Sequence, residues 1–287
     1  MRRNRGFTLI ELLVVIAILS LLVSILIPAI GKARMAGRKV ISVANLGQIN
    51  AASRMYADDN KGFMPITGTT TTRGIGNPGE PVSAWCTWSF GGKNNDGYWY
   101  TYQAGYFDVE AADRPLNPYL YPEIVWEAPD PPGRLAANHP ARKTQEAPVF
   151  RDPSDKFTRQ RTWPNETPTI SSYDDVGTSY HWNYYWYYRP PAGIPVGNRS
   201  FQWGTRQMRI AENFMSARFV WVYDQIADVI VHPDHANRSF VNGYGDINRA
   251  ILGFLDGHAA YMPMRSGQQS GPGYTLLFQF QRRDNAP

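Results

Sequence analysis

Three histidines and two aspartates in the C-terminal third of the chain have the residue types of a metal site. They are His232, Asp234, His235, Asp256 and His258. Imidazole and carboxylate groups bind zinc, and a zinc-bound water is a nucleophile at neutral pH. The pattern therefore permits a metal-dependent hydrolytic site, although residue types without a structural context produce many false matches.

A structural role competes with this chemistry at Asp256. Asp256 and Gly257 lie between two apolar runs, at 250–255 and 258–262. Asp-Gly in this position is a strong β-hairpin signal, because a type I′ turn needs positive φ at both central residues. We therefore favour a turn, and Asp256 and His258 are only weak candidates for a metal.

The acidic stretches at 58–60, 152–155 and 174–175 could instead bind a calcium ion. Ca²⁺ takes about six to eight oxygen ligands from several positions. None of these stretches has the spacing of an EF-hand loop, and acidic pairs are common in solvated turns and helix caps. Asp152 and Asp155 are therefore weak candidates, and Ca²⁺ is left open as a cofactor.

An aromatic run at 181–188 permits a carbohydrate-binding function. Exposed rings would stack on a sugar, whereas buried rings would form the core of a strand. We favour the core, because Cys86 is the only cysteine and a head without an internal disulfide must rely on burial. No Ser-His-Asp arrangement, phosphate loop or paired-carboxylate motif is readable from spacing, so we expect no enzyme activity.

The most informative residue is an acid inside an apolar segment. Phe7 to Ile30 is apolar over about 24 residues, or about 36 Å as a helix, enough to cross a hydrocarbon core of about 30 Å. Glu11 lies near its start, where an unpaired acid costs roughly 2.5–3.5 kcal/mol. Cleavage after Gly6 would offset this cost, because Phe7 would then carry a free amine one turn before Glu11. The amine of a neighbouring chain could serve instead.

The sequence from Gly6 to Glu11, GFTLIE, resembles the class III signal of type IV prepilins and type II secretion pseudopilins. The resemblance implies cleavage after Gly6, N-methylation of Phe7 and alignment of an incoming subunit by Glu11. Pro28 falls where many of those helices bend. A conventional secretory signal has a shorter apolar core and a small-residue cleavage site after it, which is not readable here. A simple signal anchor explains the length of the run and leaves Glu11 unexplained.

Short stretches of the head resemble a group of pseudopilin-like proteins with expanded heads. These stretches are Leu116–Leu120, Val149–Asp155, Tyr180–Asn183 and Phe254–Ala259. The chain departs from the pattern twice. Asp152 stands where a cysteine is usual, and Asp246 stands ten residues before Asp256 where that group has a histidine. These departures weaken a metal or redox role at both positions.

A long helix and a later sheet must position these residues. Beyond Pro28, apolar side chains recur at spacings of three and four, which predicts an amphipathic continuation of the helix to about residue 59. The predicted stripe is Ala33, Ala36, Val40, Val43, Leu46, Ile49, Ala52 and Tyr56. The polar residues 58–62 predict its end. Composition predicts strands at 218–223, 250–255, 258–262 and 274–280.

One helix followed by strands predicts an α+β fold. We expect a long N-terminal α-helix, transmembrane in its first half, packed on a C-terminal antiparallel β-sheet, in a pilin-like arrangement with large loop insertions. The expected parts are a leader at 1–6, a transmembrane and assembly helix at 7–30, its amphipathic continuation at 31–60 and a β-rich head at 61–287. Within 63–170, only 85–90 and 98–102 have strand-like composition.

Charge adds little to this expectation. The formal charge is +5, and loss of Arg2, Arg3 and Arg5 with the leader would lower it to about +2, so no nucleic-acid partner is expected. The positive-inside rule does not decide the orientation, because basic residues flank the apolar run on both sides.

The resemblance implies a structural, non-enzymatic pseudopilin subunit. A prepilin peptidase would process it, and its N-terminal helix would assemble with other subunits into a type II secretion pseudopilus or type IV pilus-like filament. Implied partners are the lipid bilayer and an inner-membrane secretion platform, with a single pass, a cytoplasmic N-terminus and a periplasmic head. The alternative is a membrane-tethered carbohydrate-binding or metal-dependent hydrolytic domain on a pilin-type anchor.

Overall fold

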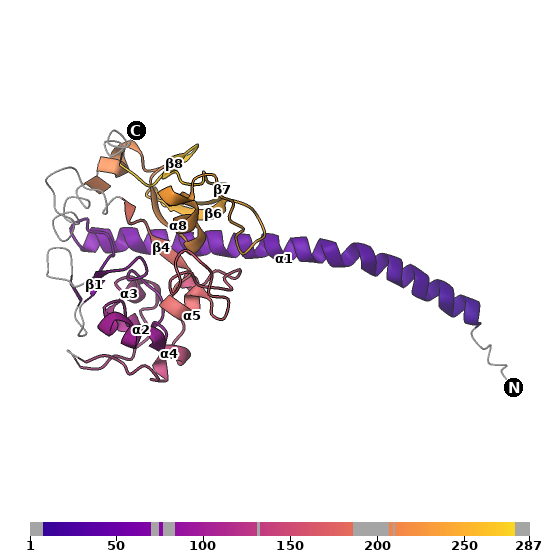
Figure 1. The fold of residues 1–287 in the computed structure, drawn as a ribbon, viewed down its shortest axis with the longest axis horizontal. Coiled ribbons are helices and arrows are strands. Elements are labelled where there is room, and N and C mark those ends of the chain that lie inside the picture. Colours follow the sequence, from indigo (N-terminus) through magenta and orange to yellow (C-terminus); the bar gives the residue numbers. More distant parts are fainter. Residues whose placement is uncertain are drawn as a thin grey trace. The chain divides into compact units, whose positions relative to one another are not determined.

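The computed structural model describes residues 8–69, 75–76, 84–130, 133–185, 207–208 and 210–278. Helix α1, Leu9–Asp59, begins the described chain and passes through Pro28 without interruption (Figure 1). The chain divides into two compact units, Met1–Val40 and Ile41–Pro287, so α1 contributes to both. The long helix and its end near residue 59 agree with the sequence prediction.

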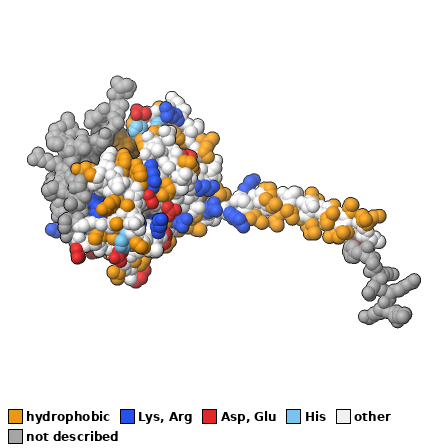
Figure 2. Space-filling view, turned by 60° about the horizontal axis from the view of Figure 1, so that its bottom comes forward, with side chains coloured by type: hydrophobic (Ala, Val, Ile, Leu, Met, Phe, Trp, Pro, Cys, Tyr) orange, Lys and Arg blue, Asp and Glu red, His pale blue; other side chains and the backbone are white. Residues whose placement is uncertain are grey.

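The first unit is dominated by exposed apolar side chains. Every Leu, Ile and Val from Leu9 to Ile30 is exposed on α1, and Figure 2 shows these side chains gathered along this part of the helix. The helix contains a stretch long and apolar enough to cross a membrane. A helix that is apolar all round needs an apolar environment, which indicates membrane anchoring.

The head contains a sheet of four antiparallel strands in the order β4-β5-β6-β7. The strands are β4 (Tyr180–Trp182), β5 (Val220–Asp224), β6 (Arg249–Phe254) and β7 (Ala259–Pro263). The predicted strand near 218–223 and the predicted hairpin are confirmed. The long helix and this sheet together confirm the pilin-like α+β fold.

The predicted strand at 274–280 is mostly wrong. Only Tyr274–Thr275 forms a strand, β9, which pairs with β8 (Ser270–Gly271). Leu276, Leu277 and Phe278 are buried without continuing it, so their apolar character reflects the core. Residues 279 and 280 lie outside the described chain.

Two helices cover the two faces of the sheet. Ala250, Leu252 and Phe254 of β6 share an apolar core with Ile226 and Ile230 of α8 (Gln225–Val231). Successive strand residues point to opposite faces, and on the other face a Cβ built at Gly253 would lie 2.9 Å from Asn50 of α1. β5 is consequently buried along its whole length. Glycine at 253 lets α1 approach the sheet closely.

The segment between α1 and the sheet holds many short elements. They are β1 (Gly68–Thr69), β2 (Ile75–Gly76), β3 (Ala84–Trp85), α2 (Gly97–Thr101), α3 (Asn117–Leu120), α4 (Ala141–Thr144), α5 (Ser172–Val176) and 3-10 turns at Tyr102–Gly105, Ala111–Asp113 and Pro148–Phe150. A further 3-10 turn, Pro233–His235, follows α8. The strand expected at 98–102 is wrong, because Asp96 caps α2 by accepting from the backbone N–H of Tyr98. The strand expected at 85–90 shrinks to Trp85 at the end of β3, with a turn at 87–90.

Buried arginines hold this segment together. Arg114 is 1% exposed. Its terminal nitrogens donate to the carbonyl oxygens of Trp88, Gly91, Val109 and Val176 and to the side-chain oxygen of Asn95. Burial lowers the pKa of Arg114 to about 10. One guanidinium thus satisfies backbone groups from four places in a region with little regular structure.

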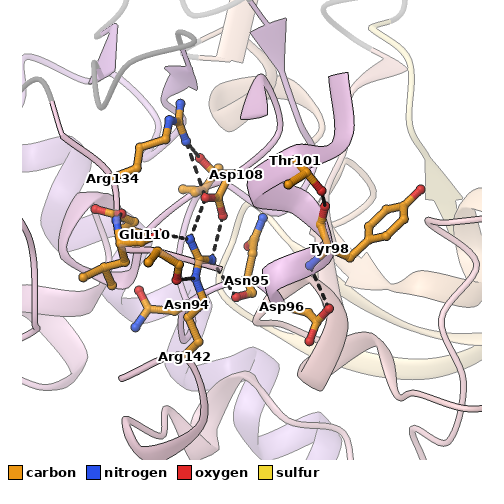
Figure 3. Close-up of polar contacts among 12 residues, drawn as sticks. Asn94, Asn95, Asp96, Tyr98, Thr101, Asp108, Glu110, Arg134 and Arg142 are labelled. Atoms are coloured by element: carbon orange, nitrogen blue, oxygen red, sulfur yellow. Dashed lines mark hydrogen bonds and ion pairs between the residues drawn. The ribbon is translucent and has the colours of Figure 1, made fainter. Parts of the chain in front are cut away.

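A second arginine makes a bidentate ion pair. Arg142 donates to both carboxylate oxygens of Asp108, at 2.9 Å and 2.7 Å. Figure 3 shows Arg134 and Arg142 both pointing toward Asp108.

The thiol of Cys86 is buried in a cluster with Trp88 and Trp99, and burial raises its pKa to about 12.

Candidate functional site

The first turn of α1 is closed by Thr8 and Glu11. The Thr8 backbone N–H and hydroxyl both donate to Glu11 Oε2 at 2.8 Å, and the Glu11 N–H donates to Thr8 Oγ1 at 3.3 Å. This reciprocal pattern is a capping box, which satisfies backbone donors that a helix start leaves free. The capping box therefore gives Glu11 a local structural role at the helix start, although a glutamine could complete the same box without a charge. The Thr-x-x-Glu spacing could have revealed the cap from sequence.

The processing residues cannot be placed in the same way. Gly6 and Phe7 lie outside the described residues, so cleavage after Gly6 and N-methylation of Phe7 stay predictions. Two further roles also stay predictions: Glu11 aligns subunits, and Pro28 marks a bend in the helix. What the geometry adds is a carboxylate held at the very start of the apolar helix.

The head-bearing part of α1 uses polar side chains that the periodicity did not predict. Asn45 Nδ2 donates to the carbonyl oxygen of Arg151 at 3.0 Å, and the indole N–H of Trp221 donates to Ser53 Oγ at 3.1 Å. From the predicted apolar stripe, Leu46, Ile49, Ala52 and Tyr56 are buried, whereas Ala33, Ala36 and Val40 are exposed. Hydrogen bonding therefore fixes the helix on the head in addition to apolar burial.

The Asp256-Gly257 turn is attached to α1. Gly257 has φ +98°, as a tight turn requires. Asn50 Nδ2 donates to the carbonyl oxygens of Gly257 and His258, and Arg54 donates to that of Leu255 at 3.0 Å. The predicted hairpin is confirmed, but its turn is not type I′, because Gly257 has positive φ and Asp256 does not, and the Gly257 N–H donates to the carbonyl oxygen of Phe254. The turn docks the hairpin on the helix.

Neither Asp256 nor His258 joins a larger ligand set. His258 Nδ1 contacts Asp256 Oδ1, and the His258 ring stacks on Phe254 with centroids 4.1 Å apart. Asp246 lies beyond the other end of β6, where the Tyr261 hydroxyl donates to it. Five strand steps separate the two ends, about 17 Å. The ten-residue spacing of Asp246 and Asp256 therefore brackets a strand and does not build one site.

The histidines at 232 and 235 do not complete a site either. His235 is buried with its Nδ1 2.6 Å from the carbonyl oxygen of Val229, while Asp234 is exposed. Across the described ranges, no three His, Cys, Asp or Glu side chains are placed to hold a metal ion. The structure therefore does not assemble the hydrolytic site considered from sequence.

Asp155 serves the local fold. Its two carboxylate oxygens accept from the N–H groups of Ser172 and Tyr173 and from the Ser179 hydroxyl. Burial raises its pKa to about 6. These bonds anchor the start of α5, so both oxygens of this calcium candidate are already in use.

The described part of the aromatic run is core. Tyr180, Trp182 and Tyr185 are buried, and the indole N–H of Trp182 donates to the carbonyl oxygen of Cys86 at 2.8 Å. Between them lies a buried pair that the sequence did not indicate, with His181 Nδ1 2.7 Å from Asp228 Oδ2. Residues 186–188 lie outside the described chain.

Comparisons with known proteins bear on the N-terminus. Residues 1–27 match the family model described as the prokaryotic N-terminal methylation motif. The chain is also 41% identical over 63 residues to the type IV wide pilus major component PilA4 of Thermus thermophilus. The N-terminal part of the chain is type IV prepilin-like. This resemblance covers 22% of the prepilin-like chain and 48% of PilA4, about half of that relative's length. No solved structure matches.

The close approach of α1 to the sheet yields a stability prediction. In Gly253→Ala the new Cβ would lie 2.8 Å from Val222 Cγ1 and 2.9 Å from Asn50 Nδ2. Overpacking of this kind costs about 1–3 kcal/mol, so we expect a lower melting temperature in detergent. Gly47→Ala is the matched control, because nothing lies within 4 Å of its Cβ position and helix propensity predicts a gain of about 0.5–1 kcal/mol. Equal melting temperatures for both variants would contradict the close packing.

Proposed function

We propose that this prepilin-like chain is a structural subunit of a pilus-like filament. The observation that carries the proposal is an exposed apolar helix whose first turn holds a carboxylate, and this turn lies within the match to the N-terminal methylation motif. A plain membrane anchor does not need a charge at this depth, because a glutamine would complete the capping box at a lower cost in lipid. PilA4, to which part of the chain is similar, is a major component of a type IV pilus.

Assembly begins with removal of the leader. Cleavage after Gly6 by a prepilin peptidase gives Phe7 a new amine, which is then N-methylated. The Glu11 carboxylate of a membrane-embedded neighbour pairs with this amine, and the apolar helices pack side by side. Helices in lipid gain from close packing and polar pairing, and a mispaired subunit leaves a charge unsatisfied. Charge pairing therefore sets the register of neighbouring subunits, and packing between their helices holds them together.

The head would lie outside the cytoplasm while α1 crosses the inner membrane once. The filament would be a type II secretion pseudopilus or a type IV pilus, with other subunits and an inner-membrane platform as partners. We propose no enzymatic role. The aromatic residues form core, and the Asp256-Gly257 turn docks on α1. These structural roles support a structural function for the head.

Substitution of Gly6 tests the processing step. Gly6→Leu should block leader removal, because a bulky side chain would stand directly before the bond to be cut. Intact-mass measurement of the chain from cells with a prepilin peptidase should find the full leader in the variant. The wild-type chain should begin at a methylated Phe7.

Asn4→Leu is the control for this test. It places the same apolar bulk two residues farther from the bond and should leave cleavage unchanged. A mature Phe7 terminus in Gly6→Leu would refute processing at this bond, and so would wild-type protein that retains Met1 to Gly6.

A further inference from the structure

A group of basic side chains lies directly after the apolar stretch of α1. The apolar run ends at Ile30, and Lys32, Arg34 and Arg38 follow it on the same helix. Figure 2 shows basic side chains gathered where the exposed apolar side chains of the helix end. We call these three residues the basic collar. The collar belongs to the first compact unit, Met1–Val40, which the apolar helix dominates.

The collar has cations on different sides of the helix. Successive residues of an α-helix turn by about 100° and rise by about 1.5 Å. Arg34 and Arg38 therefore lie on one side and Lys32 roughly on the opposite side, and together they span about 9 Å along the axis. The polar layer on each side of a bilayer is about 5–8 Å thick, since the hydrocarbon takes about 30 Å of about 40–45 Å in all. A helix whose apolar run fills the hydrocarbon thus places the collar among the headgroups.

The helix supplies no acid to neutralise the collar. Its sequence has no Asp or Glu between Glu11 and Asp58, and side chains on a helix surface meet only at spacings of three or four. In the described ranges, no ion pair joins a collar residue to a carboxylate, and Arg38 contacts only the thioether of Met35, at 3.9 Å. Lys39, which follows, has contacts of its own and is not counted in the collar.

The helix surface beside these cations is open. Lys32 and Arg34 are exposed, and a Cβ built at Gly31 or Gly37 would meet nothing within 4 Å. Long basic side chains can lay their stems along a helix and extend their charge into a polar layer. A guanidinium can also donate two parallel hydrogen bonds to one phosphate. The small neighbours therefore leave room for phosphate groups close to the helix.

Aromatic anchors are missing from this part of the chain. Trp and Tyr commonly hold a membrane helix at the level of the headgroups. Residues 8–55 contain no Trp, Tyr or Phe. The cations are consequently the side chains that can fix the depth of α1 at this end of the apolar run.

We propose that the basic collar binds the phosphate headgroups of anionic phospholipids and thereby fixes the depth of α1 in the bilayer. Each Lys or Arg near an anionic membrane surface strengthens the attraction about fivefold. Zwitterionic lipids also carry a phosphate, but their own cation neutralises it, so the collar should prefer lipids with a net negative charge. The inference depends on membrane anchoring alone, and it stands or fails independently of leader cleavage and filament assembly.

Native mass spectrometry of the full chain in detergent tests this preference. The protein is mixed with equal amounts of phosphatidylglycerol and phosphatidylcholine, and the lipid that stays bound is identified. Wild type should retain at least about fivefold more phosphatidylglycerol. The collar variant Lys32→Gln/Arg34→Gln/Arg38→Gln should retain the two lipids about equally. Glutamine has nearly the helix propensity of lysine and arginine, so the melting temperature should not change.

A control variant removes three charges from exposed positions of the head. Lys143→Gln/Lys156→Gln/Arg238→Gln should keep the wild-type preference. Raising the ammonium acetate concentration from 0.1 M to 1 M shortens the Debye length from about 10 Å to about 3 Å. The preference of the wild type should therefore weaken at high salt.

Three results would overturn the proposal. One is equal retention of the two lipids by wild type, and another is a preference that survives in the collar variant. The third comes from glycerol phosphate, which carries a headgroup phosphate without acyl chains. Displacement of phosphatidylglycerol by millimolar glycerol phosphate would show a site for free anions in place of a lipid-binding surface.

Discussion

Glu11→Ala should insert into the membrane normally and fail to enter filaments. The substitution removes an acid from the apolar helix, which lowers the cost of insertion. In the proposed filament it also leaves the amine of a neighbouring Phe7 without a counter-charge at membrane depth. Loss of one partner from a buried ion pair costs about 3–5 kcal/mol, so incorporation should fall by at least about a hundredfold. The ratio of chain in sheared filaments to chain in membranes measures this effect.

The capping box makes a sharper comparison available. Glu11→Gln keeps a side chain that can complete a capping box but removes the charge. Thr8→Ala removes half of the cap, at a cost of about 1 kcal/mol to the helix, and keeps the charge. Charge pairing predicts that Glu11→Gln fails like Glu11→Ala while Thr8→Ala still assembles. The reverse order would show that Glu11 acts only as a helix cap.

Arg114→Met should destabilise the head severely. Methionine roughly fills the space but donates no hydrogen bond, so the five acceptors now served by Arg114 lose their donor. Each buried polar group left unsatisfied costs about 1–3 kcal/mol, and a typical domain has only about 5–15 kcal/mol of stability. We expect the free energy of unfolding to fall by at least about 3 kcal/mol, measured by urea denaturation in detergent.

Arg238→Met is the matched control for this prediction. Arg238 is exposed, and surface substitutions usually change stability by about 0.5 kcal/mol or less. Arg114→Lys should lie between wild type and Arg114→Met, because an ammonium has three donors on a compact head. An Arg114→Met head as stable as the control would show that water replaces the guanidinium.

Sequence reasoning predicted the parts of the fold that depend on period and on turn chemistry. The uninterrupted apolar run indicated α1, the polar residues after position 57 indicated its end, and Asp256-Gly257 indicated the β6–β7 hairpin. The fold class follows from these elements alone. Each of these signals depends on residues that are close together in the sequence, so it can be read without knowing which distant residues come into contact.

The rest depended on contacts between distant residues. Tyr98 to Tyr102 has strand composition, yet Asp96 caps a helix there and the rings pack around Trp99. Asn45, Asn50 and Ser53 bind groups far away in the chain, in Arg151, His258 and Trp221. Likewise, Asp152 and Asp224 are far apart in the sequence but line one cavity of the folded head. The Thr8 cap differs, because its spacing was readable and only its meaning was missed.

The burial of Cys86 makes this protein convenient to label. Maleimides and similar reagents attack the thiolate, and a thiol with a pKa of about 12 supplies almost none at neutral pH. A cysteine introduced at an exposed position would therefore be modified alone, without first replacing the natural one. Reaction at Cys86 itself would then report opening of the Trp88 and Trp99 cluster, so one reagent can count surface tags in the native state and time unfolding in denaturant.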